Sequence, residues 1–344
     1  MSAARWAGPP QDAAEVLRRA KEIAPVLRER APEIEANRTL PAEVVELLRG
    51  TGVFRMCFAR EWGGPELTSV EQLEVVEALA YGDASAAWCG VIGANSGLLA
   101  NFLYQSVVKD VYPSLDLVTA GVLAPAGRAE RVPGGFRLSG RWSFGSGIKH
   151  SDWVTSGAFL FQDGEPWAEP GSPHAHDSRQ FLVPRSAVEV VDDWDTTGLC
   201  GTGSCDYTMT DVFVPDEHTF TFWEVRGTPG PLAQPDSEGV YGAMRRQWAV
   251  LAAGGTLDDL TPTERAASPL AWLHAFRASR TVVTRLYDLL QTWSINRSSP
   301  MDRWLRDTAV MCQNLTAQDA VLESVGAYLL GRPPLFRISL GLDR

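Results

Sequence analysis

The segment GRWSFGSGIKHSDW, from Gly140 to Trp153, decides how the middle of this chain folds. With the preceding GFRLS it alternates polar and apolar residues, which predicts a half-buried β-strand. Pro133–Gly135 comes before it as a hairpin turn, and the Gly/Ser-rich run Trp142–Gly147 ends it. The segment therefore predicts a strand that follows a hairpin and leads into a tight turn.

Strand patterns continue on both sides of this segment, from about Leu117 to Val214. LVTAGVLAP, DWVTSGAFLF and SRQFLVPR are further candidate strands, and the Gly/Ser-rich turn Gly198–Ser204 precedes the last one, YTMTDVFVP. In that last strand the alternation places on one face Tyr207, Met209, Asp211 and Phe213. These spacings predict an antiparallel barrel or sandwich.

The regions that flank the β-domain carry helical patterns. Residues 12–36 have apolar side chains near a 3.6-residue spacing, and Thr39, Ser69 and Asp83 are expected to begin further helices. After the β-domain, WAVLAAG, Thr261 and Pro300 mark further helices, the last of which is expected to run unbroken to Gly331. The predicted fold class is α+β, with an N-terminal helical domain (residues 1–112), a β-domain (113–222) and a shortened helical region (223–344).

Composition excludes several classes of partner. The net charge of −11 argues against a nucleic-acid partner, and against binding to anionic lipid through a basic face. There is no apolar run of about 18 residues and no secretory signal, so we expect a cytoplasmic protein that does not enter a membrane. The five cysteines are scattered, and His174 and His176 lie in a Pro/Gly-rich loop, so no metal site is expected.

Four strings carry a resemblance to a known family. They are LPAEVVELLRGTGVFRMCFAREWGG (Leu40–Gly64), EALAYGDASAAW (Glu77–Trp88), GRWSFGSGIKHSDW (Gly140–Trp153) and GLCGTGSCDYTMTDVFVP (Gly198–Pro215). In this order they resemble the acyl-CoA dehydrogenase superfamily, and within it the group D monooxygenases. The resemblance implies a homo-oligomeric oxygenase component that takes reduced FMN or FAD from a separate, diffusing flavin reductase. It also implies that the protein oxygenates an aromatic or biosynthetic small molecule.

The resemblance also implies where the site lies. In the family these strand ends line the flavin, which places the cofactor at Leu123, Ala124, Pro125, Phe144, Gly145 and Ser146. Glycine lets the backbone approach a planar ring because it has no Cβ, while Phe144 supplies a flat wall and Ser146 a polar, catalytic edge. The substrate is expected at Trp88, Asn95, Gly201, Thr202 and Ser204. For Trp88, ordinary core packing is the competing interpretation.

The chain departs from the family in two places. SSPMDRWLRD (Ser298–Asp307) resembles the approach to the active-site helix, but eight positions after Arg306 the monooxygenases carry a histidine and this chain has Asn314. We expect Asn314 at the catalytic position, although an amide cannot exchange a proton near neutral pH. Between Pro215 and WAVLAAG the family has one or two more helices, roughly 50–60 residues at about 1.5 Å rise per residue. Their loss is expected to expose apolar helix faces.

Several functions stay open. A monooxygenase fits the resemblance, and no GxGxxG motif follows a strand, so no NAD(P)H site is expected. A flavin-independent cyclase, dehydratase or isomerase on the same scaffold is the alternative that Asn314 suggests. An acyl-CoA dehydrogenase proper needs a carboxylate base, and no glutamate stands at the usual places. The titratable residues nearest the motifs form no acid–base pair by spacing: Asp83, Asp152, Asp195, Asp206 and His150.

Overall fold

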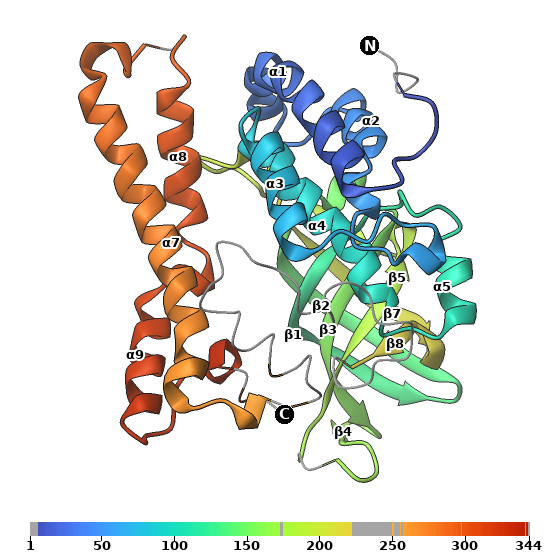
Figure 1. Ribbon diagram of the computed structural model, residues 1–344. Helices are drawn as coiled ribbons and strands as arrows, with labels where there is room; N and C mark the ends of the chain where they lie inside the picture. The colour runs from blue at the N-terminus through green and yellow to red at the C-terminus, as the bar shows by residue number, and fades with distance from the viewer. Residues whose placement is uncertain are drawn as a thin grey trace. The chain divides into compact units, whose positions relative to one another are not determined.

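The computed structural model describes residues 6–172, 175–221, 250, 255, 257–296, 298–340 and 342 of the 344-residue chain. The chain divides into two compact units, one with residues 1–195 and 200–232, the other with residues 196–199 and 233–344. The first unit begins with helices and continues into a β-sheet, and the second is helical (Figure 1). The α+β class is therefore confirmed. His174, Trp223 and most of the WAVLAAG segment lie outside the described residues.

The N-terminal helices are α1 (Ala13–Asn37), α2 (Ala42–Thr51), α3 (Ser69–Ala80), α4 (Ala84–Ala100) and α5 (Gln105–Val111). Asp83 caps α4 as expected, since its side chain accepts from the backbone N–H of Ala86. Two other predicted caps are wrong. Thr68, not Ser69, caps α3 and forms a capping box with Glu71. Helix α2 begins after Pro41 rather than after Thr39, and Pro41 makes no side-chain cap.

The strands are β1 (Thr119–Val132), β2 (Gly135–Gly145), β3 (Trp153–Gln162), β4 (Glu165–Pro166), β5 (Ser178–Pro184), β6 (Glu189–Val191), β7 (Cys205–Pro215) and β8 (Thr219–Phe220). They form one eight-stranded sheet in the order β6-β7-β2-β1-β3-β5-β8, with β4 paired to β3. Helices α3 and α4 lie over one end of this sheet (Figure 1).

All described strand pairs are antiparallel except β1 and β3, which run parallel. The exception follows from the connection between β2 and β3. Because β1 and β2 are antiparallel, the end of β2 and the start of β1 lie at the same end of the sheet. The chain then passes to the other side of β1 and enters β3 with Trp153 paired to Thr119. Asp152 holds the connection between β2 and β3 against the start of β1. Its backbone N–H donates to the Val118 carbonyl, and its carboxylate accepts from the Val118 N–H at 2.8 Å.

Strands β1 and β2 pair only from Arg128–Ser139 to Val132–Gly135 and then separate. The Trp142 side chain, fully buried, fills the space where they part and donates from Nε1 to the Gly157 carbonyl at 2.8 Å. Gly127 and Gly140 make room for it, because a Cβ on either would overlap its indole ring. The split at this end of the sheet is therefore built around one tryptophan.

The alternation predicted for β7 holds for Tyr207 and Met209 and is wrong from Asp211 onward. Tyr207 and Met209 are buried, whereas Phe213 is 45% exposed. Asp211 interrupts the strand with a positive φ of 52°, and the register with β2 shifts between Gly140 and Leu138. This β-bulge adds one residue to β7 and reverses the side that later residues face.

The second unit contains α7 (Pro262–Leu289), α8 (Met301–Met311) and α9 (Asp319–Leu329), with α8 and α9 both packed along α7 (Figure 1). Thr261 caps α7 with a capping box to Glu264, as its sequence predicts. The single helix expected after Pro300 is wrong, because the chain breaks after Met311 and forms a short 3₁₀ turn over Leu315–Ala317. Across the described residues, no helix is long and apolar enough to span a membrane.

Candidate active site

A chain of buried hydrogen bonds joins four of the predicted site residues. The indole Nε1 of Trp88, on α4, donates to Ser146 Oγ at 3.0 Å. Ser146 Oγ lies 2.7 Å from Ser204 Oγ, and Ser204 Oγ lies 2.7 Å from Thr202 Oγ1. The three hydroxyl-bearing residues are at most 7% exposed. Three segments that are distant in the sequence thus meet in one polar chain, which we call the hydroxyl chain.

Glycines hold the two turns that carry the hydroxyl chain. Gly147 adopts a φ of 74°, and its N–H donates to the Thr202 carbonyl at 2.9 Å, which ties the end of β2 to the 200–204 turn. Gly201 is buried, and a Cβ there would overlap the Ile34 side chain on α1. The structure therefore places Gly201 at a packing contact, where its lack of a side chain lets the turn approach α1.

Apolar residues, which we call the apolar strip, are exposed on the two strands that approach Tyr207, since the Val122 N–H donates to its hydroxyl and Gly145 packs against its ring. The strip consists of Leu123, Ala124 and Pro125 on β1 and of Phe144 on β2. Leu123 is 43% exposed and Phe144 is 69% exposed. Phe144 also has a φ of 70°, which is a strained conformation for a bulky residue. A strained, exposed aromatic two residues before a buried serine is a candidate binding element.

Strand β1 is irregular where it carries the apolar strip. Its register with β3 shifts on both sides of Pro125. Beneath the strip, the Tyr207 hydroxyl accepts from the Val122 N–H at 3.1 Å and lies 2.8 Å from Ser156 Oγ. Burial raises the pKa of Tyr207, which therefore stays a neutral partner. Sequence reasoning did not assign Tyr207 this role, although a tyrosine on an inward face needs a partner for its hydroxyl.

The remaining first-unit site residues lie on β2 and α4. Gly145 is buried, and a Cβ there would lie 2.9 Å from the Tyr207 ring. Asn95 stands two turns along α4 from Trp88, on the same side of the helix, and is half-buried. Phe144 contacts Trp194 edge-to-face, with ring centroids 6.3 Å apart, and no sequence signal had singled out Trp194.

His150 lies next to the turn that carries Ser146. Both of its ring nitrogens are buried and have no hydrogen-bond partner among the described residues. Burial and, to a smaller extent, the positive charge of Arg49 together lower its pKa to about 4. His150 is therefore a neutral imidazole at physiological pH. It packs against Gly147, since a Cβ on that glycine would lie 3.1 Å from His150 Nε2.

Of the aspartates nearest the motifs, Asp83, Asp152 and Asp206 have carboxylates engaged in structural contacts. Asp83 caps α4, and Asp152 accepts from the Val118 N–H. Asp206 accepts from Arg141 Nε at 2.8 Å, and the backbone N–H of Asp195 donates to the Asp193 carbonyl. The described residues hold no group of three or more side chains suited to a metal ion. The polar groups of the hydroxyl chain and the adjacent turn are hydroxyls, an indole N–H and one neutral imidazole.

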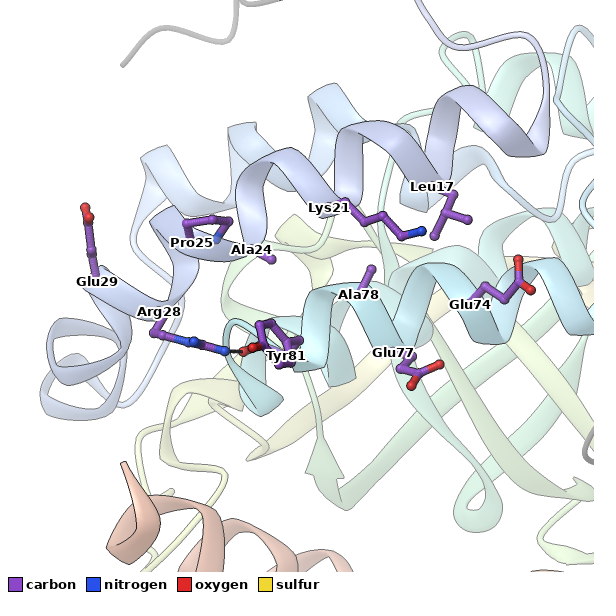
Figure 2. A pocket seen from close by; sticks show the side chains of 10 residues that line it. All are labelled: Leu17, Lys21, Ala24, Pro25, Arg28, Glu29, Glu74, Glu77, Ala78 and Tyr81. Carbon is purple, nitrogen blue, oxygen red and sulfur yellow. Dashed lines mark hydrogen bonds between the residues drawn. The ribbon is translucent and has the colours of Figure 1, made fainter. Parts of the chain in front are cut away.

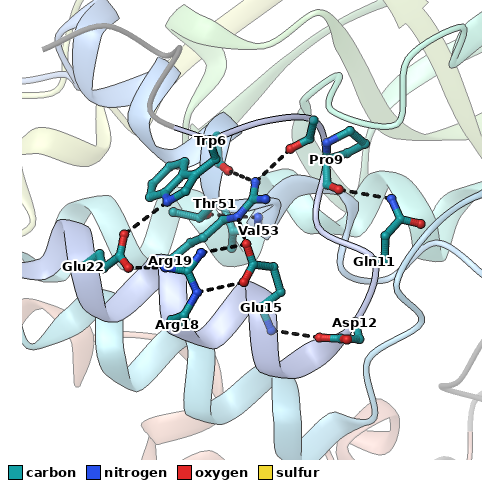
Figure 3. Close-up of polar contacts among 12 residues, drawn as sticks. Trp6, Pro9, Gln11, Asp12, Glu15, Arg18, Arg19, Glu22, Thr51 and Val53 are labelled. Carbon is teal, nitrogen blue, oxygen red and sulfur yellow. Dashed lines mark hydrogen bonds and ion pairs between the residues drawn. The ribbon is translucent and has the colours of Figure 1, made fainter.

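Two hollows lie among the N-terminal helices and the N-terminal segment, apart from the residues of the hydroxyl chain. A groove of about 820 Å³ lies between α1 and α3, with an apolar floor that includes Leu17 and Ala78 and a rim that includes Glu74 and Glu77 (Figure 2). Near the N-terminus, Arg19 donates to Glu15 and to the carbonyls of Gly8 and Gly50, and packs over the Trp6 ring (Figure 3). These contacts of Arg19 join the N-terminal segment to α1 and α2, so the hollow around Arg19 has a structural role.

Comparison with known proteins identifies the fold. Residues 13–107 match the family model "Acyl-CoA dehydrogenase, N-terminal domain". A solved structure, the 3-HSA hydroxylase of Rhodococcus sp. RHA1, superposes with a TM-score of 0.80 over 93% of this chain and 97% of its own, at 23% identity. Residues 13–107 therefore resemble an acyl-CoA dehydrogenase N-terminal domain, and the chain as a whole shares the fold of this hydroxylase. The order of helices, sheet and helices expected from the four strings is thus confirmed.

Two relatives of this chain are named as monooxygenases. It is 31% identical to the flavin-dependent monooxygenase oxygenase subunit HsaA of Rhodococcus jostii (strain RHA1), over 65% of this chain and 57% of that protein. It is 27% identical to the indole-3-acetate monooxygenase of Pseudomonas putida, over 90% of this chain and 92% of that protein. The chain spans little more than half the length of the first of these relatives.

The second alignment also bears on the predicted deletion. It is 369 residues long, whereas 90% of this 344-residue chain is about 310 residues. About 60 aligned positions of that relative therefore have no counterpart here. The shortfall agrees in size with the one predicted between the β-domain and the last helices. Relative to that protein, this chain is shorter by about this number of residues within the aligned region.

Asn314, the predicted catalytic residue, lies in the second unit. Its Oδ1 accepts from the Thr316 N–H at 3.0 Å and from Thr316 Oγ1 at 2.8 Å, so it caps the 3₁₀ turn that follows α8. Its backbone carbonyl accepts from Gln318 Nε2 at 3.1 Å. In the described structure the Asn314 side chain stabilises the break between α8 and α9.

Proposed function

We propose that this protein is the oxygenase component of a two-component flavin-dependent monooxygenase that acts on an aromatic or other small biosynthetic molecule. The observation that carries the proposal is the hydroxyl chain together with the apolar strip. A flavin ring combines an apolar half with a polar half of nitrogen and oxygen atoms. A site for it needs a flat apolar wall and a few fixed polar groups, which this region supplies.

Reduced FMN or FAD would be held by residues of the first unit. Phe144 would supply the wall, Leu123–Pro125 the neighbouring apolar surface, and Ser146 the polar edge. When bound, the reduced flavin supplies the two electrons with which O₂ is activated. The residues of this chain bind and orient the ring and exclude water from it, and Trp88 and Asn95 on α4 face the substrate.

The partners follow from the same proposal. A separate reductase would deliver the reduced flavin by diffusion, and a relative named as an oxygenase subunit supports this division of labour. We also propose that the chain forms a homo-oligomer. Large apolar side chains are exposed on α7 and in the turn that follows it, among them Val282, Leu289 and Trp293. Such a face is typical of a surface that another subunit covers.

Anaerobic titration with reduced and oxidised FMN and FAD tests the cofactor. We expect reduced flavin to bind, and the Ser146→Ala variant to bind it about tenfold more weakly, the value of one good hydrogen bond. Ser143→Ala, an exposed hydroxyl on the same strand, is the matched control and should bind normally. A folded wild-type protein that binds neither flavin in either redox state would contradict the proposal.

A flavin-independent enzyme on the same scaffold is the second candidate. The observation in its favour is Asn314, whose side-chain oxygen is engaged by Thr316 and which cannot exchange a proton. Turnover of the pathway substrate by flavin-free protein, with no dependence on added flavin or O₂, would support this candidate over the monooxygenase.

A further inference from the structure

We infer that Ser204 and Thr202 are positioning residues that let the Ser146 hydroxyl serve either as a hydrogen-bond acceptor or as a donor toward the flavin edge. This inference rests on the proposed function and concerns residues that need not touch the flavin themselves. Its basis is the direction in which protons can be shared along the hydroxyl chain.

Trp88 sets one end of the hydroxyl chain. An indole N–H can only donate, so Ser146 Oγ must accept from it. Ser146 then has one proton and one free lone pair. If its proton points to Ser204, and the proton of Ser204 points to Thr202, the free lone pair of Ser146 is an acceptor for a ligand N–H.

The opposite arrangement uses the same atoms. If Thr202 donates to Ser204, and Ser204 donates to Ser146, the proton of Ser146 is released to a ligand acceptor. Both oxygen–oxygen distances are 2.7 Å, and in both contacts either atom can be the donor. Because the three hydroxyls are nearly fully buried, no bulk water replaces a lost partner. The protons must therefore reorient together.

A flavin presents these two demands in its two redox states. The central nitrogen N5 carries a hydrogen in the reduced ring and only a lone pair in the oxidised ring. The reduced ring therefore needs an acceptor and the oxidised ring a donor at the same place. A serine whose proton can turn inward or outward satisfies both, whereas a serine with no inward acceptor satisfies only the oxidised ring.

The test is the ratio of the dissociation constants for reduced and oxidised flavin. In Ser204→Ala the Ser146 proton loses its inward acceptor, so binding the reduced ring leaves a buried O–H without a partner. We expect this variant to bind reduced flavin about fivefold more weakly relative to oxidised flavin than the wild type does. The reduction potential of the bound flavin should fall accordingly.

Thr202→Val is the second variant, nearly equal in shape to the wild type. It removes the acceptor for Ser204, which then donates to Ser146, so the ratio should change in the same direction. Ser143→Ala is the control and should leave the ratio unchanged. Equal weakening of both redox states in folded variants, or an unchanged ratio, would overturn the inference alone. A wild-type protein that binds no flavin would overturn both the proposed function and this inference.

Discussion

Two apolar surfaces of this protein differ in what lies beside them. The apolar strip of the first unit, which includes Leu123 and Phe144, adjoins buried polar groups that are joined to one another by hydrogen bonds. The apolar face of α7 lies on a helix whose unit has a small core, with Ala266, Val325 and Leu340 buried together. The first surface suits a small ligand with a polar edge, and the second suits another protein surface.

The spacing of the second surface supports this distinction. On α7, Val282, Leu286 and Leu289 follow one another at intervals of four and three residues and each is at least 44% exposed, while the half-exposed Trp293 lies in the 3₁₀ turn after the helix. This is the spacing with which helices pack along a common seam. No such periodicity marks the apolar strip, whose Leu123, Ala124 and Pro125 are consecutive. We therefore expect mutations in the two surfaces to have separable effects.

The largest expected effect separates a framework tryptophan from a surface one. Trp142→Ala should lower the free energy of unfolding by about 4 kcal/mol, because it empties the space between β1 and β2 and removes a buried hydrogen bond. Trp293→Ala, the same change at a side chain that is 50% exposed, should cost under about 1 kcal/mol in the subunit itself. Urea denaturation followed by circular dichroism measures both. Similar losses would show that Trp142 does not hold the split sheet.

The second prediction concerns pH. The pKa of His150 is near 6.5 in the unfolded chain and is lowered to about 4 by burial in the folded one. The unfolded state therefore takes up a proton first, and stability contributed by the neutral ring is complete above pH 6.5. It is lost as the pH falls toward 4, by up to about 3 kcal/mol.

The groups that bear on this titration are few. Arg49 acts on His150 through its charge, and the Cys89 thiol near Gly147 stays neutral because burial raises its pKa. His150→Phe, which cannot take up a proton, should flatten the fall in unfolding free energy between pH 6.5 and 4. His176→Phe is the matched control in the first unit. A wild-type and a His150→Phe protein with the same pH profile would contradict the assignment.

The third prediction compares the effect of one new carboxylate in each of the two surfaces. Leu289→Asp places a carboxylate in the α7 seam and should weaken self-association by about 2 kcal/mol or more, seen as a lower mass in light scattering. Leu123→Asp, in the apolar strip, should leave the mass unchanged and weaken binding of reduced flavin. If both variants changed the mass equally, the distinction between a ligand surface and a subunit surface would fail.

Sequence reasoning was most accurate where local chemistry alone determines structure. The helix starts at Asp83 and Thr261 and the hairpin at Pro133–Gly135 are set by neighbours within a few residues, and each is present. The resemblance of four strings supplied the fold class. Of the site, it indicated Trp88, Ser146, Thr202 and Ser204, but not that they bond to one another.

What the sequence could not predict depends on contacts between distant segments. The parallel pairing of β1 and β3 depends on which side of β1 the chain passes, and the bulge at Asp211 depends on pairing with β2. The break after Met311 arises because Asn314 bonds to Thr316 instead of continuing the helix. The role of Tyr207 beneath the apolar strip also needs three strands to be in place.

The smallest expected effect uses a motif that the two units share. Thr68 with Glu71 caps α3, and Thr261 with Glu264 caps α7, by the same pair of hydrogen bonds. Thr68→Ala and Thr261→Ala should each cost about 1 kcal/mol, and the Thr→Ser variants should cost far less because they keep the hydroxyl.

Hydrogen exchange shows which helices lose stability in each variant. If the two units open independently, Thr68→Ala should speed exchange in α3 and leave α7 unchanged, and Thr261→Ala should do the reverse. The second unit, with its smaller core and exposed seam, should then lose protection over its whole length, whereas the loss in the first unit should stay within α3. Faster exchange in both units for either variant would mean that they unfold as one, and that the contrast between the two surfaces is not a contrast in stability.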